Sequence, residues 1–235
     1  MDTLYIVMPA YNEEANIEAV VDQWYPLLEE KSEASRLIIA DAGSSDRTHE
    51  ILEDLKNTHP KLQILENTDR YHGPKLMALY QYAIDNNADY IFQTDSDGQT
   101  DPVEFEKFWQ QRKEHDGIFG YRPVRGDGKM RKLVEKVVCL LLKLYFKVDV
   151  PDANAPFRLM KAETLKKYMG RLPKDFNIPN IMFTTFFVHY NERTKFEQIS
   201  FKPRRAGNNS INIGKIFKIG MKALGDFSRF KKEMS

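Results

Sequence analysis

Four short runs of mostly apolar residues constrain the fold of this chain more than any other feature. Segments with helical periodicity separate them, and the runs are Leu4–Met8, Leu37–Ala40, Leu62–Leu65 and Tyr90–Thr94. Such runs are typical of strands buried on both faces, and strands that alternate with helices indicate a parallel sheet. We predict an α/β fold with a doubly wound, mostly parallel central sheet flanked by helices. The first helix is expected to be capped by Asn12 and to run to about Glu30.

The residues that follow these runs predict where a ligand would bind. Pro9, Asp41 and Asp95 each follow a predicted strand. The carboxyl ends of parallel strands meet at one edge of the sheet, and open α/β sheets bind their ligands there. We therefore expect a nucleotide site in this crevice. The sequence has no G-x-G-x-x-G segment and no Walker loop, which argues against a dinucleotide site and a P-loop site.

The fourth run leads into a cluster of oxygen donors, Asp95, Asp97 and Gln99. Burying two unpaired carboxylates would cost far more than the packing recovers, so we expect them at the exposed end of the strand. Two carboxylates and an amide oxygen suit a Mg²⁺ or Mn²⁺ ion that keeps waters and shares substrate phosphates. On these residues alone, a solvated Asp-Ser-Asp-Gly turn is an equal interpretation.

Length and composition narrow the class of protein. The 235 residues suit one domain, with room for a small appendage. The lone Cys139 excludes an intramolecular disulfide and fits a reducing compartment. The segment Met1–Ala10 lacks the basic flank of a signal peptide, and no segment reaches the roughly 20 apolar residues of a membrane span. We therefore expect a cytoplasmic protein.

The net charge of +1 conceals a strong asymmetry along the chain. Residues 1–120 carry 10 Lys and Arg against 24 Asp and Glu, whereas residues 121–148 carry 8 against 2 and residues 201–235 carry 9 against 2. Both basic blocks are also rich in apolar residues. This pairing favours an anionic partner with an apolar body over a nucleic acid, although two solvated basic helix faces would give the same pattern.

Five segments in order resemble the family-2 glycosyltransferases of GT-A (Rossmann-like) fold. The resemblance is to the polyprenyl-phosphate branch, which contains dolichyl-phosphate mannosyltransferase. The segments are Val7–Glu14 (VMPAYNEE), Asp41–Thr48 (DAGSSDRT), Asp95–Pro102 (DSDGQTDP), Asp152–Arg158 (DANAPFR) and Phe201–Ser210 (FKPRRAGNNS). Two positions depart from the family pattern. Ala42 stands where the family has a second aspartate, and Pro156 replaces the usual glycine.

The resemblance implies transfer of a hexose from a nucleoside diphosphate sugar to a polyprenyl (dolichyl or undecaprenyl) phosphate, with inversion. A divalent ion would stabilise the charge that grows on the leaving diphosphate. The implied metal ligands are Asp95, Asp97 and Gln99, and the implied catalytic residues are Asp95, Asp97 and Arg204. The implied nucleotide-sugar ligands are Pro9, Tyr11, Glu13, Asp41, Asp95, Arg122, Arg158 and Arg204, with the arginines as phosphate clamps. Without the family pattern, Tyr11 would be interpreted as a core aromatic and Glu13 as a helix-start charge.

The acceptor is less strongly specified. Many relatives that use hydroxyl acceptors carry a Glu-Asp pair after the Phe-Arg segment, and here Asp175 is its only substitute. A phosphate acceptor is already anionic and needs no general base, so the missing pair favours a lipid phosphate. The alternatives are a hydroxyl-directed family-2 enzyme of cell-surface glycan synthesis, with Asp175 as base, and a non-catalytic, membrane-associated nucleotide-sugar sensor. A nucleotidyltransferase is disfavoured because a glycine-rich basic loop is absent after Met8.

Two segments suit contact with a membrane surface. In Arg131–Val148 a stripe of lysines lies largely opposite apolar residues, and Ile213–Lys232 has the same amphipathic pattern. We predict a GT-A domain at residues 1–212 and a basic amphipathic helix at residues 213–235, with the protein peripheral at the cytoplasmic membrane face. An integral-membrane partner is a further candidate anchor, and helices packed on the domain are the alternative.

Overall fold

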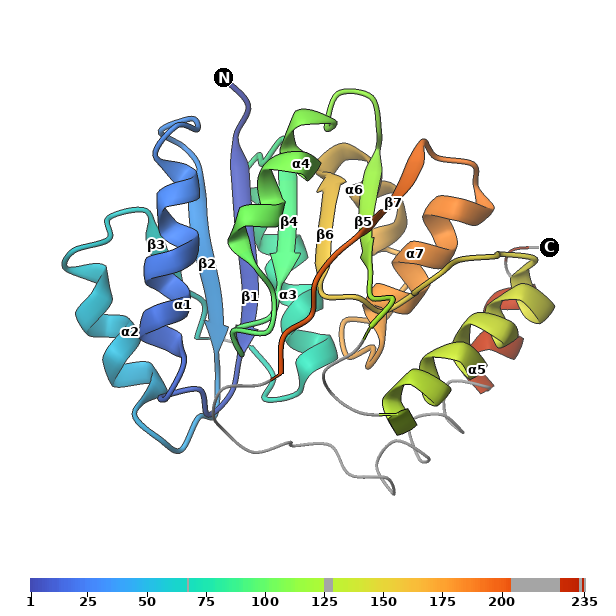
Figure 1. Ribbon diagram of the computed structural model, residues 1–235, viewed down its shortest axis with the longest axis horizontal. Coiled ribbons are helices and arrows are strands. Elements are labelled where there is room, and N and C mark those ends of the chain that lie inside the picture. The colour runs from blue at the N-terminus through green and yellow to red at the C-terminus, as the bar shows by residue number, and fades with distance from the viewer. Residues whose placement is uncertain (67, 125–128, 204–224, 233, 235) are drawn as a thin grey trace.

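A single seven-stranded sheet organises the molecule and has helices on both faces (Figure 1). The computed structural model describes every residue except 67, 125–128, 204–224, 233 and 235. The strand order is β3-β2-β1-β4-β6-β5-β7, and β6 runs antiparallel to both of its neighbours while the other pairs are parallel. The predicted α/β class, with a mostly parallel and doubly wound sheet, is confirmed.

The elements follow the expected alternation through the first half of the chain. The strands are β1 (Leu4–Ala10), β2 (Arg36–Asp41), β3 (Leu62–Ile64), β4 (Tyr90–Thr94), β5 (Gly117–Tyr121), β6 (Phe157–Lys161) and β7 (Thr194–Gln198). The helices are α1 (Ile17–Trp24), α2 (Thr48–Lys56), α3 (His72–Asp85), α4 (Phe105–Gln110), α5 (Lys129–Phe146), α6 (Ala162–Met169) and α7 (Pro179–His189).

Two apolar cores cover the two faces of the sheet, because successive side chains of a strand point to opposite faces. In β1, Val7 belongs to the core beneath α3, α5, α6 and α7, whereas Ile6 and Met8 belong to the core beneath α1, α2 and α4. All seven residues of β1 are buried. This double burial explains why the run is apolar throughout instead of alternating with polar residues.

The first helix is shorter than the sequence predicted. Asn12 adopts a left-handed backbone conformation with φ of 55°, and its side-chain oxygen accepts a 2.8 Å hydrogen bond from the Ser45 amide. It therefore ties two loops together instead of capping α1, which begins at Ile17. The α-helix ends at Trp24 and continues as a 3-10 turn, because Pro26 has no amide hydrogen and disfavours helical geometry just before it.

The described part of the C-terminal segment packs on the protein. Residues 225–232 are helical, and the Phe227 ring lies 5.6 Å from that of Phe146 on α5. The Phe230 ring lies 5.7 Å from that of Phe176, and both side chains are buried. Phe227, which lies in the segment whose amphipathic pattern suits a membrane surface, is covered by its aromatic neighbours. The rest of the apolar face predicted for this segment lies outside the described residues.

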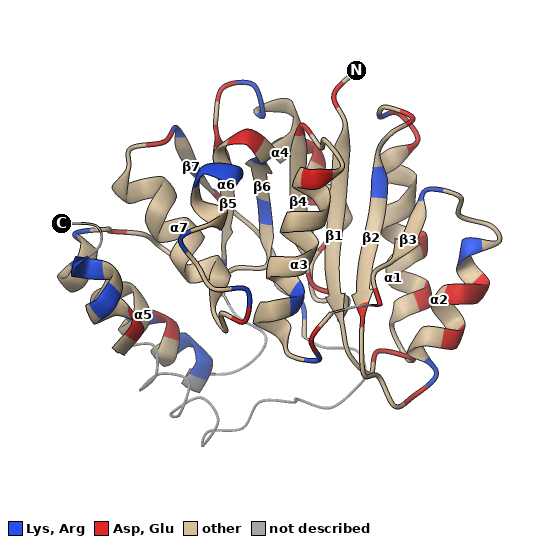
Figure 2. Ribbon diagram, turned by 180° about the vertical axis from the view of Figure 1, so that it is seen from behind, with Lys and Arg blue, Asp and Glu red and all other residues tan. Residues whose placement is uncertain are grey.

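Charge is distributed unevenly over the helices, as the sequence indicated. Basic residues recur along α5 and acidic residues along α2 (Figure 2). Among the described residues, no helix is both long enough and apolar enough to cross a membrane.

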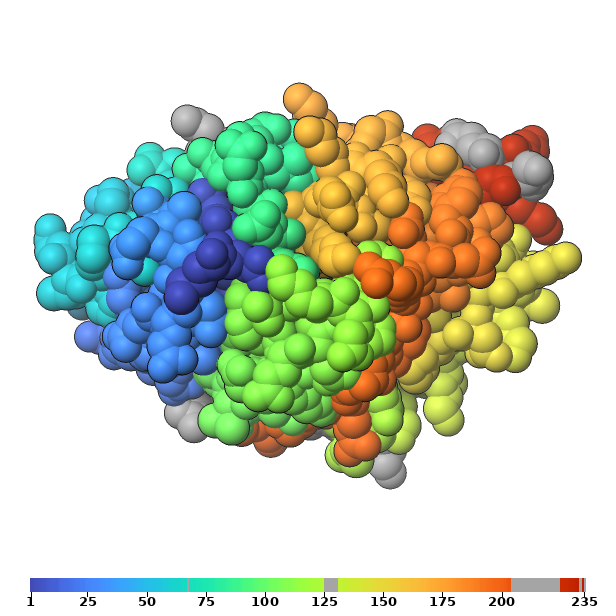
Figure 3. Space-filling view, turned by 90° about the horizontal axis from the view of Figure 1, so that it is seen from above, coloured from blue at the N-terminus to red at the C-terminus, as the bar shows by residue number. Residues whose placement is uncertain are grey.

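At the amino ends of the parallel strands, the first residues of the chain are hydrogen-bonded to neighbouring loops. The Arg112 guanidinium donates a 2.8 Å hydrogen bond to Asp2, and the Thr3 amide donates one of 2.7 Å to Asp89. Figure 3 looks onto this edge, where the dark blue N-terminal residues lie against the green segment that carries α4. The opposite edge, at the bottom of Figure 1, carries the loops that follow β1 and β2 and the turn that follows β4.

Gly73→Ala should destabilise the fold by about 1–3 kcal/mol, the usual range for overpacking. A Cβ at Gly73 would lie 2.3 Å from the carbonyl oxygen of Phe176 and 2.5 Å from the backbone of Asn177, neither of which can move as a side chain would. Urea unfolding of both chains measures the difference. Gly170→Ala is the matched control, since a Cβ there meets nothing within 4 Å. Equal stability of the two variants would contradict the close approach of α3 to this loop.

Candidate active site

Two loops at the carboxyl edge of the sheet, residues 11–16 and 42–47, are joined by side-chain hydrogen bonds. The Glu13 amide donates to the Thr48 hydroxyl at 2.8 Å, and the Glu14 amide donates to Asp46 at 3.1 Å. Asp46 also accepts from the Thr48 amide at 3.0 Å, as a residue at the start of α2 should. These bonds fix the two loops relative to each other and so place the residues that we predicted to bind a nucleotide.

The two carboxylates predicted to bind the nucleotide, Asp41 and Glu13, are buried and hydrogen-bonded. Asp41 ends β2, accepts a 2.5 Å bond from the Ser44 hydroxyl, and lies 3.4 Å from Nδ1 of His49. Glu13 accepts a 2.7 Å bond from the Asn16 side chain. The Tyr11 side chain, in contrast, is 42% exposed. An accessible ring near buried acceptors suits stacking against a base and hydrogen bonding to a base or a ribose.

Lys75 lies beneath this region and was not predicted. It is 1% exposed, donates to the carbonyl of Ala10, and places Nζ 5.4 Å from the centre of the Tyr11 ring. Burial lowers the pKa of Lys75 to about 8, while the charges of Asp41 and Asp69 oppose that shift. A lysine in the first turns of a helix is normally a surface residue, so the sequence carried no signal for its burial.

The segment after β4 forms the turn that its glycine predicted. Gly98 has φ of 70°, and the Gln99 amide donates to Asp97 at 3.1 Å. The Gln99 side chain donates its NH₂ to the Lys202 carbonyl at 2.7 Å, which leaves its oxygen as the atom that could bind a cation. The Ser96 hydroxyl bonds the Pro9 carbonyl at 2.8 Å, so this turn and the end of β1 are held together.

Asp95 has two polar neighbours that the sequence analysis missed. Its Oδ1 accepts a 3.2 Å hydrogen bond from the Gln93 side chain and lies 3.3 Å from Nε2 of His72. Carboxylate and amide oxygens in one half-buried turn fit the hard-donor preference of Mg²⁺ and Mn²⁺, with substrate phosphates and water completing the shell. The donor set is therefore compatible with the expected metal.

The predicted arginine clamps are placed differently. Arg158 lies on β6, is 1% exposed, and donates to the Asn180 carbonyl at 2.8 Å and to the Thr184 hydroxyl. The structure places it behind the end of β4, and its contact with a phosphate stays a prediction. Arg122 makes a two-pronged ion pair with Asp152 at 2.7 and 3.1 Å. Arg204 lies outside the described residues.

A cavity of about 400 Å³ lies beside Arg122, between α5 and the ends of β5 and the loop before β6. Its lining combines cations (Arg122, Lys132 and Lys136), carboxylates (Glu135 and Asp152) and several apolar residues, among them Tyr121, Val150 and Pro151. Burial and the neighbouring Asp152 raise the pKa of Glu135 to about 7. Because β5 is two strands from β4, the cavity lies about 10 Å along the sheet edge from the end of β4.

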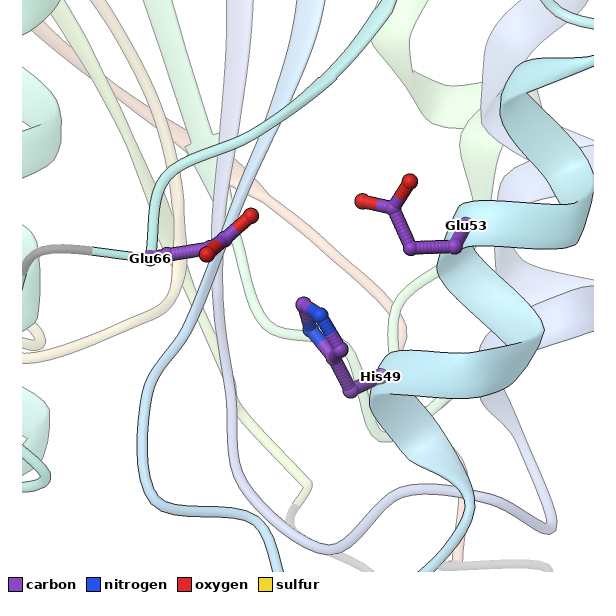
Figure 4. A group of neighbouring side chains, drawn as sticks. All are labelled: His49, Glu53 and Glu66. Atoms are coloured by element: carbon purple, nitrogen blue, oxygen red, sulfur yellow. The ribbon is translucent and has the colours of Figure 1, made fainter.

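A second group of possible metal ligands lies between α2 and the segment that follows β3 (Figure 4). His49, Glu53 and Glu66 each offer one ligand atom, and these atoms lie within 4.8 Å of one another. The three side chains are exposed or half-buried, and such groups are common on surfaces without a metal. We assign no metal to this group.

The comparison with known families shows to which family the chain belongs. A family model of glycosyl transferase family 2 matches residues 5–168, which include the loops after β1 and β2 and the turn after β4. The chain belongs to glycosyl transferase family 2. The resemblance inferred from the five sequence segments is therefore confirmed at the level of the family.

Transferases of sugars also stand among the curated relatives. The chain is 26% identical over 141 residues to undecaprenyl-phosphate 4-deoxy-4-formamido-L-arabinose transferase of Pectobacterium carotovorum subsp. carotovorum, covering 59% of this chain and 42% of that protein. It is 26% identical over 226 residues to the uncharacterized glycosyltransferase YkcC of Bacillus subtilis, covering 95% of this chain and 68% of that protein. The chain thus spans less than half the length of the first of these relatives.

Solved structures confirm the GT-A fold expected for this branch of the family. Glucosyl-3-phosphoglycerate synthase of Mycobacterium tuberculosis, in complex with Mn²⁺ and UDP-glucose, superimposes with a TM-score of 0.68 at 18% identity. The match covers 95% of this chain and 77% of that one. At this identity the similarity establishes the fold alone.

Glu135 should give the stability of this glycosyltransferase domain a pH dependence that Glu135→Gln removes. The pKa is about 7 when folded against an ordinary value of 4.5, so between these values the folded chain binds more protons than the unfolded chain. The contribution of Glu135 to the free energy of unfolding therefore falls as pH rises through this window, and levels off above it. Urea unfolding measures the free energy of unfolding at about pH 5 and about pH 8. Between these pH values it should fall less for Glu135→Gln than for the unaltered chain.

The matched control is Glu106→Gln, at an exposed position on α4. This variant should keep the pH dependence of the unaltered chain. An unchanged fall in Glu135→Gln would show that Glu135 ionises normally and is not buried as described.

Proposed function

We propose that this glycosyltransferase moves a hexose from a nucleoside diphosphate sugar to a polyprenyl phosphate at a membrane surface, with a divalent cation and inversion. The observation that carries the proposal is the outer surface of α5. Four apolar side chains on it are 48–64% exposed, namely Leu133, Val137, Leu140 and Leu144. Exposed lysines accompany them on the same helix at Lys132, Lys136 and Lys143. Apolar groups bordered by cations suit the surface of an anionic bilayer.

The donor half of the reaction uses the loops after β1, β2 and β4. Tyr11 stacks on the base, and Asp41 and Glu13 accept hydrogen bonds from the base or the ribose. Asp95, Asp97 and Gln99 hold the cation, which when bound supplies positive charge to the departing diphosphate. UDP is the first nucleotide to test, because UDP-glucose is named with the structural neighbour.

The acceptor half uses the cavity between α5 and the end of β5. Its cations, Arg122, Lys132 and Lys136, attract an anionic head, while the apolar surface of α5 faces the lipid. An oxygen of the acceptor phosphate attacks the anomeric carbon, the bond from that carbon to the diphosphate breaks, and the configuration inverts. The name of the relative that acts on undecaprenyl phosphate supports this class of acceptor.

Two alternatives differ in the chemistry that they require. A hydroxyl acceptor would need a general base, for which the exposed Asp175 is the candidate. A non-catalytic sensor would need neither Asp95 nor Asp97. We propose a peripheral position at the cytoplasmic membrane face, with or without an integral-membrane partner.

The direct test is turnover of nucleotide sugars, UDP-hexoses first, with Mn²⁺ and a short polyprenyl phosphate. Asp97→Ala should lower the rate by at least about 100-fold, because it removes a ligand of the cation whose charge stabilises the leaving group. Asp175→Asn is the matched carboxylate control and should stay within about twofold, since a phosphate needs no base. Circular dichroism checks that both variants fold.

The outcomes separate the alternatives. A 100-fold loss in Asp175→Asn, with hydroxyl acceptors used in place of the lipid phosphate, would favour the glycan-building enzyme. Nucleotide-sugar binding without any turnover would favour the sensor.

The outer surface of α5 should bind vesicles of phosphatidylglycerol and phosphatidylcholine, and the binding should weaken as salt rises. Replacing Leu133, Leu140 and Leu144 together by Gln should release the protein from the vesicles, because it removes the apolar groups that insert into the bilayer. Co-sedimentation at low and high salt measures this. Val103→Gln, at an 84% exposed position far from α5 in the sequence, is the control and should bind normally. Equal sedimentation of both variants would show that α5 is not the contact.

A further inference from the structure

A row of buried polar side chains lies behind Asp95 and has no role in the chemistry described so far. The Gln93 NH₂ donates to Asp95 at 3.2 Å, the Asn180 NH₂ donates to the Gln93 oxygen at 3.0 Å, and the Tyr80 hydroxyl donates to the Asn180 oxygen at 2.7 Å. Gln93, Asn180 and Tyr80 are all buried. The row joins β4, α7 and α3 and ends at the half-buried turn after β4.

The direction of these hydrogen bonds is determined by the two ends. A carboxylate only accepts, so Gln93 must present its NH₂ to Asp95 and its oxygen to Asn180. Asn180 must then present its NH₂ to Gln93 and its oxygen to Tyr80, whose hydroxyl donates. Burial raises the pKa of Tyr80, which keeps that proton in place. Neither amide can turn over without setting two acceptors or two donors against each other.

Arg158 anchors the row at Asn180. Its guanidinium donates to the backbone carbonyl of Asn180 at 2.8 Å and to the Thr184 hydroxyl. The arginine that the sequence predicted as a phosphate clamp thus holds the residue that determines the orientation of Gln93.

We infer that the row Arg158, Tyr80, Asn180 and Gln93 positions the Asp95 carboxylate for the cation, and that Asn180 is a positioning residue for metal binding although it does not contact Asp95. The inference rests on the proposed metal site and deepens it. Fully buried amides are costly unless they are paired, and apolar residues could fill the same space at lower cost. Hydrogen-bonding partners of a metal ligand typically contribute about 10–100-fold to metal affinity.

The test compares direct Mn²⁺ binding in the unaltered protein and in three variants, without a sugar donor, by electron paramagnetic resonance of the free ion. Asn180→Asp keeps an oxygen that accepts from Tyr80, but it removes the NH₂ that donates to the Gln93 oxygen. Beside Arg158 the new carboxylate is ionised, so the Gln93 amide turns and sets its oxygen against Asp95. We expect the dissociation constant for Mn²⁺ to rise by about 10–100-fold.

Two further variants keep the inference open to refutation if Asn180→Asp does not fold. Tyr80→Phe removes one hydroxyl, frees the Asn180 amide, and should weaken Mn²⁺ binding by about three- to fivefold, the effect of one hydrogen bond. Thr185→Ala is the matched control, because Thr185 is a buried polar residue of α7 whose hydroxyl bonds only the Ile181 carbonyl of its own helix among the described residues. It should bind Mn²⁺ normally.

A spectroscopic readout needs no metal. The side-chain NH₂ resonances of Gln93, assigned by ¹⁵N NMR, should be shifted and slow to exchange in the unaltered protein and lose both properties in Asn180→Asp. If the unaltered protein binds no Mn²⁺, the proposed metal site fails. If it binds Mn²⁺ but Asn180→Asp and Tyr80→Phe match Thr185→Ala, the metal site stands and the inference about the row is overturned.

Discussion

The junction between β4 and the turn that follows it imposes the constraint on which the rest of the structure depends. Gln93 and Thr94 are fully buried in the centre of the sheet, yet the next residue, Asp95, must reach solvent and a ligand. The strand therefore brings polar groups into an apolar layer, and each needs a partner. Thr94 finds the Thr100 hydroxyl at 2.7 Å, and Gln93 finds Asp95 and Asn180. The helices α3 and α7 supply the partners that a sheet alone could not.

The two halves of the sheet carry side chains of different charge at this edge. The parallel half, β3 to β4, ends in loops whose backbone amides and carboxylates hold each other, so its acidic residues are ordered before any ligand binds. The half that contains β5, β6 and β7 instead brings cations to the same edge, with Arg122 paired to Asp152 and lysines along α5. An anionic donor held through a cation and an anionic acceptor held by lysines would thus meet from opposite sides.

The antiparallel strand β6 links these halves. It pairs with both β4 and β5, and it carries Arg158 into the core between them. Its register sets Arg158 opposite Gln93 on β4, which explains how a charged residue comes to serve a carboxylate at the sheet edge without touching it. The centre of the buried Phe119 ring lies 4.8 Å from the Arg158 guanidinium, so the ring packs against the charged group.

Much of the fold and part of the site followed from the sequence, because the signals were local. Continuous apolar runs indicate strands that are buried on both faces, and the order of the five segments indicates the family. The positions of Asp41 and Asp95 at strand ends followed from the same runs. The first helix was predicted too long, since the reach of Asn12 to Ser45 depends on a loop 33 residues away.

By itself, then, the sequence determined the mostly parallel sheet and the carboxylates at the carboxyl ends of its strands. Only the tertiary structure decided that Arg158 lies behind the site, that Lys75 is buried beneath Tyr11, and that Phe227 is covered by α5. The physical reason is that burial and hydrogen-bond partners are properties of residues far apart in the chain. Asn180 meets Gln93 across 87 positions and Tyr80 across 100, distances at which no local pattern of residues carries information.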